Sequence, residues 1–161
     1  MASLGSGWCH GSMEVNVRDV AVRDREAWLR MRSALWPGTS DEHRAEIEQF
    51  FAGKFPRGPW SVLVAEHESL PVGFAELSIR SYAEGCEGHR VAYLEGWFVE
   101  AEVRGRGIGR ALIAAAEAWG RTQGCTEFAS DADPQNVVSI EAHKALGFAD
   151  AGLVQCFRKD L

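Results

Sequence analysis

Glycines and arginines alternate in one short stretch of the chain, Arg104 to Arg110. The stretch follows an apolar run, Val91 to Val99, and opens an amphipathic segment that continues to about Gly124. Glycine lets backbone amides approach a ligand closely, and the first N–H groups of a helix carry partial positive charge. Arginine side chains add charge-assisted hydrogen bonds. The pattern therefore predicts a cradle for phosphate groups at a strand-to-helix turn.

Two common phosphate-binding motifs do not fit this stretch. A nucleotide P-loop ends in Gly-Lys-Ser/Thr, and the dinucleotide fingerprint is spaced Gly-x-Gly-x-x-Gly. Instead, Arg104, Gly107 and Gly109 fit the pattern Arg/Gln-x-x-Gly-x-Gly/Ala. This resembles the pyrophosphate loop of the GCN5-related N-acetyltransferases, the GNAT superfamily, and the resemblance implies binding of acetyl coenzyme A. Taken alone, the stretch is also compatible with an arginine-rich surface turn.

One carboxylate, Glu95, lies at the centre of the apolar run. Because side chains alternate along a strand, we expect Glu95 to share a face with Tyr93 and Trp97. Apolar surroundings disfavour the charged form of a carboxylate, which suits a proton acceptor acting directly or through water. Gly96 removes a side chain where a ligand could approach. The alternative interpretation is a half-exposed glutamate paired with an arginine on the next strand.

A second carboxylate, Asp131, follows a short strand-like segment that starts near Phe128. The carboxyl ends of strands are where open α/β sheets bind ligands, so Asp131 is a candidate for substrate binding. Asp133 comes two residues later, and we expect it to cap the following helix.

Hydrophobic periodicity predicts the elements that hold these residues. The predicted class is α+β, with a mixed, mostly antiparallel central sheet flanked by helices. The expected strands are 14–20, 60–66, 72–79, 91–99, 127–130 and 154–158. The expected helices are 24–35, a second one capped by Ser40 and ended by Pro56 to Pro59, a third after the glycine-rich turn that buries Ile108, Leu112, Ala115 and Trp119, and 137–146.

Length and composition narrow the class of protein. The 161 residues fit one domain, which we place at 13–161, and the Gly- and Ser-rich residues 1–12 are expected to be a disordered leader or a junction remnant. No apolar run reaches the roughly 18 residues of a membrane span. The net charge of −6 argues against non-specific nucleic-acid binding and permits a cationic substrate. The four cysteines lack metal-ligand spacing, so we expect free thiols, no metal and a cytoplasmic location.

Several separated motifs occur in one order along the chain. They are Leu35-Trp36-Pro37-Gly38, Gly73-Phe74-Ala75, Ser78-Ile79-Arg80, Tyr82 before Gly85-Cys86, Leu94-Glu95-Gly96, Ala129-Ser130-Asp131 and His143-Lys144-Ala145-Leu146-Gly147-Phe148. This set resembles one GNAT branch, the aminoglycoside 6′-N-acetyltransferases. The resemblance covers about residues 15–159, so it concerns the GNAT fold of the whole domain.

The resemblance implies an aminoglycoside pocket formed by Trp36, Tyr82, Glu95 and Asp131, with both carboxylates at the reaction centre. For Trp36 and Tyr82, ordinary packing is the alternative. The resemblance also implies acetyl-CoA as co-substrate and a homodimer. The implied acetyl-CoA contacts are Trp97, Phe98, Val99, Arg104, Gly105, Arg106, Gly107, Ile108, Gly109, Arg110 and Asn136.

The chain departs from its relatives at the position of the general acid. Many relatives place a tyrosine four residues before the Gly-Phe pair, where this chain has His143. Three interpretations stay open: His143 protonates the leaving thiolate, the thiol needs little help because its ordinary pKa is about 8.5, or His143 is structural.

Two other functions fit the same sequence. One is a GNAT enzyme that acetylates a polyamine, a small metabolite or a protein N-terminus. The other is a non-catalytic acyl-CoA-binding sensor, which would bind acetyl-CoA without turnover.

Overall fold

The structure is a computed structural model that describes residues 15–36, 38–54 and 61–161. The expected leader at 1–12 and the helix-ending segment Pro56 to Pro59 lie outside these residues. The elements are β1 (Asn16–Asp19), η1 (Val22–Asp24), α1 (Arg25–Leu35), α2 (Ser40–Phe51), β2 (Ser61–His67), β3 (Leu70–Arg80), β4 (Val91–Val99), η2 (Ala101–Val103), α3 (Ile108–Thr122), β5 (Phe128–Ser130) and α4 (Val137–Ala145).

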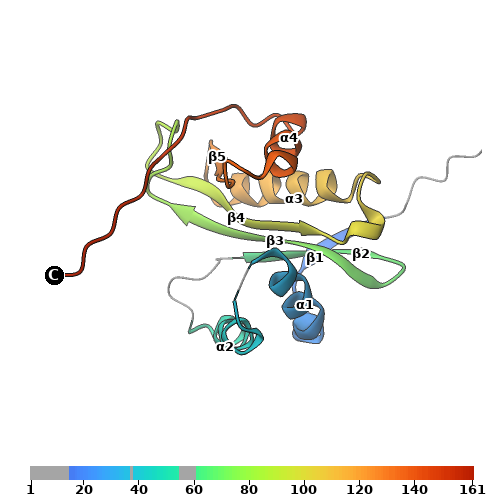
Figure 1. The fold of residues 1–161 in the computed structure, drawn as a ribbon. Helices are drawn as coiled ribbons and strands as arrows, with labels where there is room; N and C mark the ends of the chain where they lie inside the picture. The colour runs from blue at the N-terminus through green and yellow to red at the C-terminus, as the bar shows by residue number, and fades with distance from the viewer. Residues whose placement is uncertain (1–14, 37, 55–60) are drawn as a thin grey trace, which may run out of the picture.

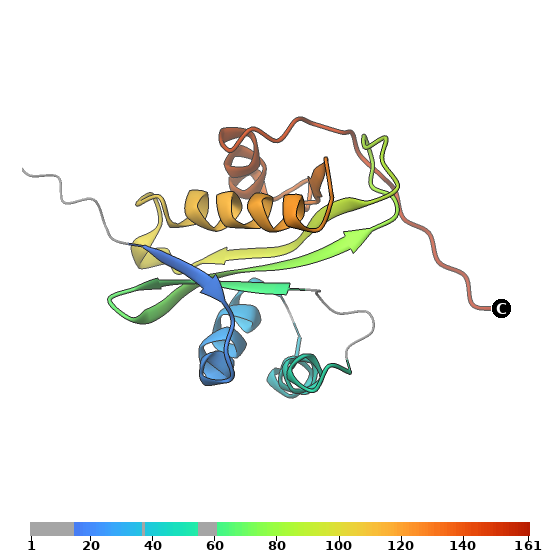
Figure 2. The same ribbon diagram turned by 180° about the vertical axis from the view of Figure 1, so that it is seen from behind.

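The five strands form one mixed sheet in the order β1-β2-β3-β4-β5. Strands β1 to β4 pair antiparallel, and β5 pairs parallel with β4. Helices α1 and α2 cover one face of the sheet, and α3 and α4 lie on the other (Figures 1 and 2). The predicted class and the mostly antiparallel sheet are confirmed.

Each face of the sheet has its own hydrophobic core. On the α1 and α2 face, Trp28 and Ile47 pack with Phe74 of β3. On the α3 face, Leu112 and Ala116 pack with side chains of β2, β3 and β4. The predicted burial of Ile108 and Leu112 is confirmed. By contrast, Ala115 and Trp119 are only partly buried, because the sheet-facing stripe of α3 runs through Ile113, Ala116 and Gly120.

The residue that caps α2 lies one position earlier than the sequence suggested. Thr39, and not Ser40, is the N-cap. Its Oγ1 accepts a hydrogen bond from the Glu42 amide at 3.1 Å, and the Glu42 carboxylate accepts one from the Thr39 amide at 3.1 Å. This reciprocal capping box satisfies two backbone amides at the start of the helix. Ser40 cannot take that role because it is already inside the helix.

The strand predicted at 154–158 is not formed. The chain from residue 149 onward has no helix or strand and runs away from the sheet (Figure 1). A strand needs a neighbour for its backbone hydrogen bonds, and the structure provides none for this segment. The segment therefore leaves Leu153, Val154 and Phe157 exposed, the last at 92%.

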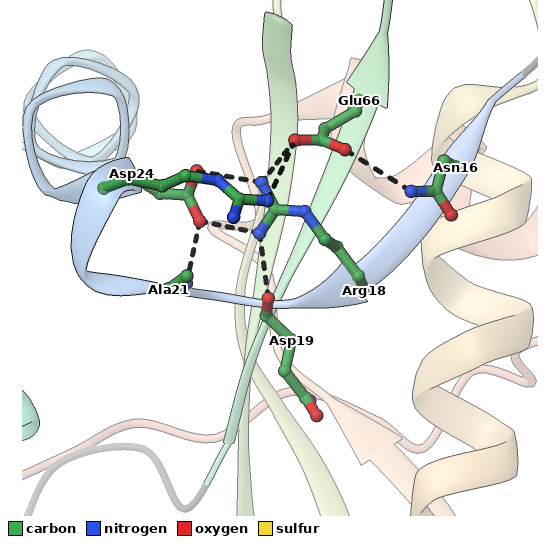
Figure 3. Close-up of polar contacts among 7 residues, drawn as sticks. Asn16, Arg18, Asp19, Ala21, Asp24 and Glu66 are labelled. Carbon is green, nitrogen blue, oxygen red and sulfur yellow. Dashed lines mark hydrogen bonds and ion pairs between the residues drawn. The ribbon is translucent and has the colours of Figure 1, made fainter. Parts of the chain in front are cut away.

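An ion-pair cluster fixes the start of α1 to the edge of the sheet (Figure 3). Arg18 of β1 donates two hydrogen bonds to Asp24, at 2.7 and 2.9 Å, and also pairs with Glu66 of β2. Asp24 is 3% exposed. The Arg18 guanidinium lowers the pKa of the Asp24 carboxyl, so the cluster is ionised at neutral pH. It anchors α1, whose carboxyl end carries Trp36.

Candidate active site

A bulge in β4 sets the direction of Glu95. In the register between β3 and β4, Glu76 pairs with Gly96 and Leu77 pairs with Leu94, so Glu95 has no partner. An extra residue of this kind interrupts the alternation of side chains. Tyr93 accordingly packs in one cluster, with Val91 and Ala83, while Trp97 packs against the core under α3. The expectation that Glu95 shares a face with both aromatic residues is therefore wrong.

A cleft of about 660 Å³ opens beside this bulge. The parallel ladder between β4 and β5 ends where Leu94 pairs with Ser130. Beyond that point the edge of β4 has no neighbouring strand among the residues described. The cleft brings together six of the predicted site residues from segments far apart in the sequence: Trp36, Glu95, Trp97, Asp131, Asn136 and His143.

Glu95 is held by two polar side chains of β3. Arg80 donates from Nε to Oε1 at 3.0 Å and from Nη2 to Oε2 at 2.5 Å, and Ser78 Oγ donates to Oε1. The Glu95 side chain is 28% exposed. The alternative interpretation of Glu95, a half-exposed partner of an arginine on the next strand, thus describes its contacts, and the same carboxylate also lines the cleft.

The ring of Tyr93 packs against the guanidinium of Arg80. The Arg80 guanidinium lies 3.4 Å from the centre of the Tyr93 ring. Burial, together with the negative charge of Asp131, raises the pKa of Tyr93 to about 12. The phenol is therefore neutral, and its ring offers a cation–π surface that limits where Arg80 can lie.

Trp36 occupies the space that Gly96 leaves free. A Cβ atom on Gly96 would lie 2.3 Å from Cη2 of Trp36. The sequence suggested that a ligand approaches the chain at Gly96. Instead, the glycine allows an indole to close against the strand, and this indole forms one wall of the cleft.

The loop after β5 supplies polar groups to the opposite wall. Asp131 is exposed there. Asn136 is the N-cap of α4, because its side chain accepts a hydrogen bond from the Ser139 amide at 3.0 Å. Asp133 does not cap the helix as expected; it accepts from the Gln135 amide at 2.8 Å and closes a turn before it.

His143 lies on α4 with both ring nitrogens engaged. Nδ1 is 2.7 Å from the Ser139 carbonyl oxygen, which can only accept, so Nδ1 carries a proton. Nε2 is 3.0 Å from Ser130 Oγ. The ring meets Trp97 edge-on, with centroids 5.6 Å apart. This arrangement fits a structural histidine, and it also connects the imidazole to the cleft through a hydroxyl.

The glycine-rich turn has the backbone geometry of a ligand cradle. Gly105 and Gly107 have φ angles of 75° and 88°, and a Cβ on either would meet no atom within 4 Å. The turn leads directly into α3, whose first amides have no partner within the helix. These features fit an anion such as a pyrophosphate.

The residues of the turn divide by role. Arg104 folds back and donates from Nε to the Val99 carbonyl at 2.8 Å, while Arg106 and Arg110 are exposed. Ile108 is buried and anchors the helix. A Cβ on Gly109 would lie 2.6 Å from Trp97, so this glycine admits the indole.

Trp97 connects the turn to the cleft. Its ring packs at Gly109 on one side and meets His143 on the other. It also lines the cleft itself. The turn and the cleft thus form two neighbouring parts of one site.

Outside the glycine-rich turn, three predicted substrate or cofactor residues do not line the cleft: Tyr82, Phe98 and Val99. Tyr82 is 66% exposed in the loop between β3 and β4. Phe98 stacks on Phe74 on the α1 and α2 face, with ring centroids 6.2 Å apart. Phe98 and Val99 can reach a ligand only through their backbone groups at the edge of β4.

Sequence reasoning missed Ser78 and Arg80 as site residues. Part of the signal was present, because Ser78 lies in the strand predicted at 72–79 and Arg80 follows its predicted end directly. In the structure β3 extends through Arg80, so the two residues share a face. Over the described ranges, no group of three or more His, Cys, Asp or Glu could hold a metal ion, and no helix is long and apolar enough to cross a membrane.

Comparisons with known proteins identify the family of this chain. The family model described as the acetyltransferase (GNAT) family matches residues 25–148. A relative from Klebsiella aerogenes, named aminoglycoside N(6′)-acetyltransferase type 1, is 51% identical over 147 residues, which cover 90% of this chain and 96% of the relative.

Two solved structures are similar over almost the whole chain, each with a TM-score of 0.83 and 36% identity. One is the aminoglycoside N-acetyltransferase AAC(6′)-Iy in complex with CoA, matched over 92% of this chain and 96% of that one. The other is AAC(6′)-Iy with the bisubstrate analogue CoA-S-monomethyl-acetylneamine, matched over 92% and 99%. The chain therefore belongs to the GNAT acetyltransferase family.

Proposed function

We propose that this protein transfers the acetyl group of acetyl-CoA to the 6′-amine of aminoglycoside antibiotics and so confers resistance to them. The observation that carries the proposal is a cleft that joins Trp36, Glu95 and Asp131. This cleft occurs in a chain 51% identical to a named aminoglycoside N(6′)-acetyltransferase.

The glycine-rich turn and the edge of β4 would hold acetyl-CoA. The amides at the start of α3 suit its pyrophosphate, and Arg106 and Arg110 add exposed positive charge. On the edge that faces β5, the backbone groups of β4 beyond Leu94 lack a strand neighbour among the described residues and are available to the rest of the molecule. Acetyl-CoA supplies the thioester whose carbonyl carbon the amine attacks.

The cleft suits a polycationic sugar. Asp131 is an exposed carboxylate at one wall, and Glu95 adds a second carboxylate inside the cleft. Both can accept charge-assisted hydrogen bonds from ammonium groups. Trp36 offers an aromatic surface to the face of a sugar ring.

Glu95 is our candidate for the proton acceptor, acting directly or through water. An ammonium must lose a proton before its nitrogen can attack a carbonyl carbon, and Arg80 and Ser78 fix the carboxylate that would receive it. Asp131 would bind the amine nearby, and backbone amides around Trp97 to Val99 would stabilise the developing oxyanion.

His143 is our candidate for the group that protonates the departing thiolate. Its Nε2 faces Ser130 Oγ, and both residues line the cleft. For this role the ring must carry a proton on Nε2 as well as on Nδ1. The imidazolium would pass its Nε2 proton to the Ser130 hydroxyl, which gives its own proton to the thiolate, and His143 is left neutral with its proton on Nδ1.

The protein is proposed to act as a cytoplasmic homodimer. The exposed side chains of Leu153, Val154 and Phe157 support pairing of the carboxyl-terminal segment with a second copy, because apolar side chains of this size gain free energy from being covered. The free thiols Cys86, Cys125 and Cys156 fit a reducing compartment. Sedimentation analysis would test the dimer.

An amine panel tests the function against its alternatives. The purified protein is incubated with acetyl-CoA and kanamycin, tobramycin, spermidine or a peptide amine, and thiol release is followed. We expect turnover with the two antibiotics. Turnover only with spermidine or the peptide would favour a GNAT enzyme for another amine, and tight acetyl-CoA binding without turnover would favour a sensor.

A further inference from the structure

A buried ion pair lies on the face of the sheet opposite α3. Arg32 of α1 donates from Nε to Oε1 of Glu76 at 2.9 Å, and Trp28 Nε1 donates to the same oxygen at 2.9 Å. Arg32 is 8% exposed and Glu76 is 2% exposed. Arg32 also pairs with Glu46 of α2, so one guanidinium joins both helices to β3.

This pair contacts the wall of the cleft. The Arg32 guanidinium carbon lies 5.2 Å from the centre of the Trp36 ring, and the Trp36 amide donates to the Arg32 carbonyl at 3.0 Å. On the sheet, Glu76 pairs with Gly96, the glycine that Trp36 covers and the neighbour of the bulged Glu95. The ion pair is therefore linked to the cleft from two directions.

Stability alone does not explain why charges occupy this place. Moving two charges out of water costs several kcal/mol per ion, and well-packed apolar residues of similar volume are often as stable or more so. Phe74 and Trp28 lie in the same core, and the buried imidazole of His43 also lies against Arg32, with Nδ1 3.4 Å from Nη1. What a planar guanidinium adds is direction, since its fork and its face bind different partners at fixed angles.

We propose that Arg32, oriented by Glu76, is a positioning residue that holds Trp36 against Gly96 and so sets the amine side of the cleft. This inference rests on one part of the proposed function, namely that the cleft binds the amine substrate. It predicts that disturbing the buried pair weakens use of the amine while leaving use of acetyl-CoA intact.

Steady-state kinetics of Arg32→Met and Arg32→Lys test this. Arg32→Met is expected to raise the KM for the amine about tenfold, with the KM for acetyl-CoA within about twofold of wild type, because only one wall of the site has moved. Arg32→Lys keeps the charge and should recover part of the loss. Arg44→Met is the matched control, since Arg44 also joins α2 to α1, through Glu26, but on the exposed surface.

A double-mutant cycle distinguishes positioning from a general loss of structure. If Arg32 acts through Trp36, then adding Arg32→Met to a Trp36→Ala variant should raise the KM for the amine by no more than about a further twofold. Full additivity, or a parallel rise in the KM for acetyl-CoA, would overturn the proposal. Should Arg32→Met fail to fold by circular dichroism, Glu76→Gln is put through the same cycle, because it keeps the side-chain volume.

The two proposals fail in different ways. Wild-type protein that acetylates spermidine but no antibiotic would remove the proposed function, and the cycle would then be run with spermidine. Wild-type protein that acetylates antibiotics, together with an Arg32→Met variant of unchanged amine KM, would remove this inference alone.

Discussion

Arg80 donates a hydrogen bond to each oxygen of the Glu95 carboxylate, with Nε 3.0 Å from Oε1 and Nη2 2.5 Å from Oε2. A fork of this kind fixes the plane of a carboxylate as well as its charge. It also neutralises that charge before any substrate arrives. A substrate ammonium must therefore share Glu95 with Arg80, whereas Asp131 and Asp133 are exposed carboxylates of the cleft lining.

Glu95→Gln should lower kcat by about 10²- to 10⁴-fold, the usual contribution of a general base. Acetyl-CoA binding, measured by calorimetry, should stay within about twofold of wild type, because the glycine-rich turn is unchanged. Glu141→Gln serves as the control, since this exposed glutamate pairs with Lys144 along α4. Equal kcat in Glu95→Gln and wild type would remove Glu95 from the mechanism.

Arg80→Met should lower both the kcat and the KM for the amine, for different reasons. We expect kcat to fall about tenfold because Glu95 loses its orientation, and the KM for the cationic amine to fall because the carboxylate is no longer neutralised. Arg30→Met is the control, as Arg30 forms an exposed ion pair with Glu100. A raised amine KM with unchanged kcat would contradict this role.

Gly107→Ala should weaken acetyl-CoA binding. Gly107 has a φ of 88°, and its missing Cβ would project into open space beside the start of α3. Gly53→Ala is the matched control, with a φ of 65° and equally open surroundings after α2. Each change should cost about 1 kcal/mol of stability. Only Gly107→Ala should raise the dissociation constant of acetyl-CoA, and an equal effect of both would refute the cradle.

Burial of Glu76 makes stability depend on pH. Desolvation raises the pKa of Glu76 to about 7 in the folded protein, against the opposing effect of Arg32. Because the folded pKa lies above the unfolded one, the stabilising contribution is full below the unfolded pKa and is lost as the pH rises through about 7. Relative to Glu76→Gln, wild type should lose on the order of 2 kcal/mol between pH 5.5 and 8, measured by urea unfolding. Parallel pH curves for the two proteins would contradict this.

Local patterns in the sequence predicted most of the fold. Strand β4 (Val91–Val99) has the predicted bounds, because nine largely apolar residues at the centre of a sheet leave little ambiguity. The helices were also clear from their apolar spacing. The absence of a strand at 154–158 could not be predicted, since a strand depends on a neighbouring strand that no local pattern reveals.

The site was predicted less completely, for physical reasons. Glu95 and Asp131 were identifiable by type and place, but the bulge that turns Glu95 depends on the register between two strands. Arg32 and Glu76 read as ordinary polar positions of a helix and a strand, and only their burial across 44 residues of sequence shows that they form a pair. Trp36 filling the space above Gly96 is likewise a long-range contact.

The most direct test of the central claim is the position of the acetyl group. Kanamycin is incubated with acetyl-CoA and the purified protein, and the product is analysed by mass spectrometry and two-dimensional NMR. The account predicts one added acetyl group, on the 6′-nitrogen, and almost none with Glu95→Gln. Acetylation at another nitrogen, or no acetylated antibiotic from a protein that binds acetyl-CoA, would contradict it.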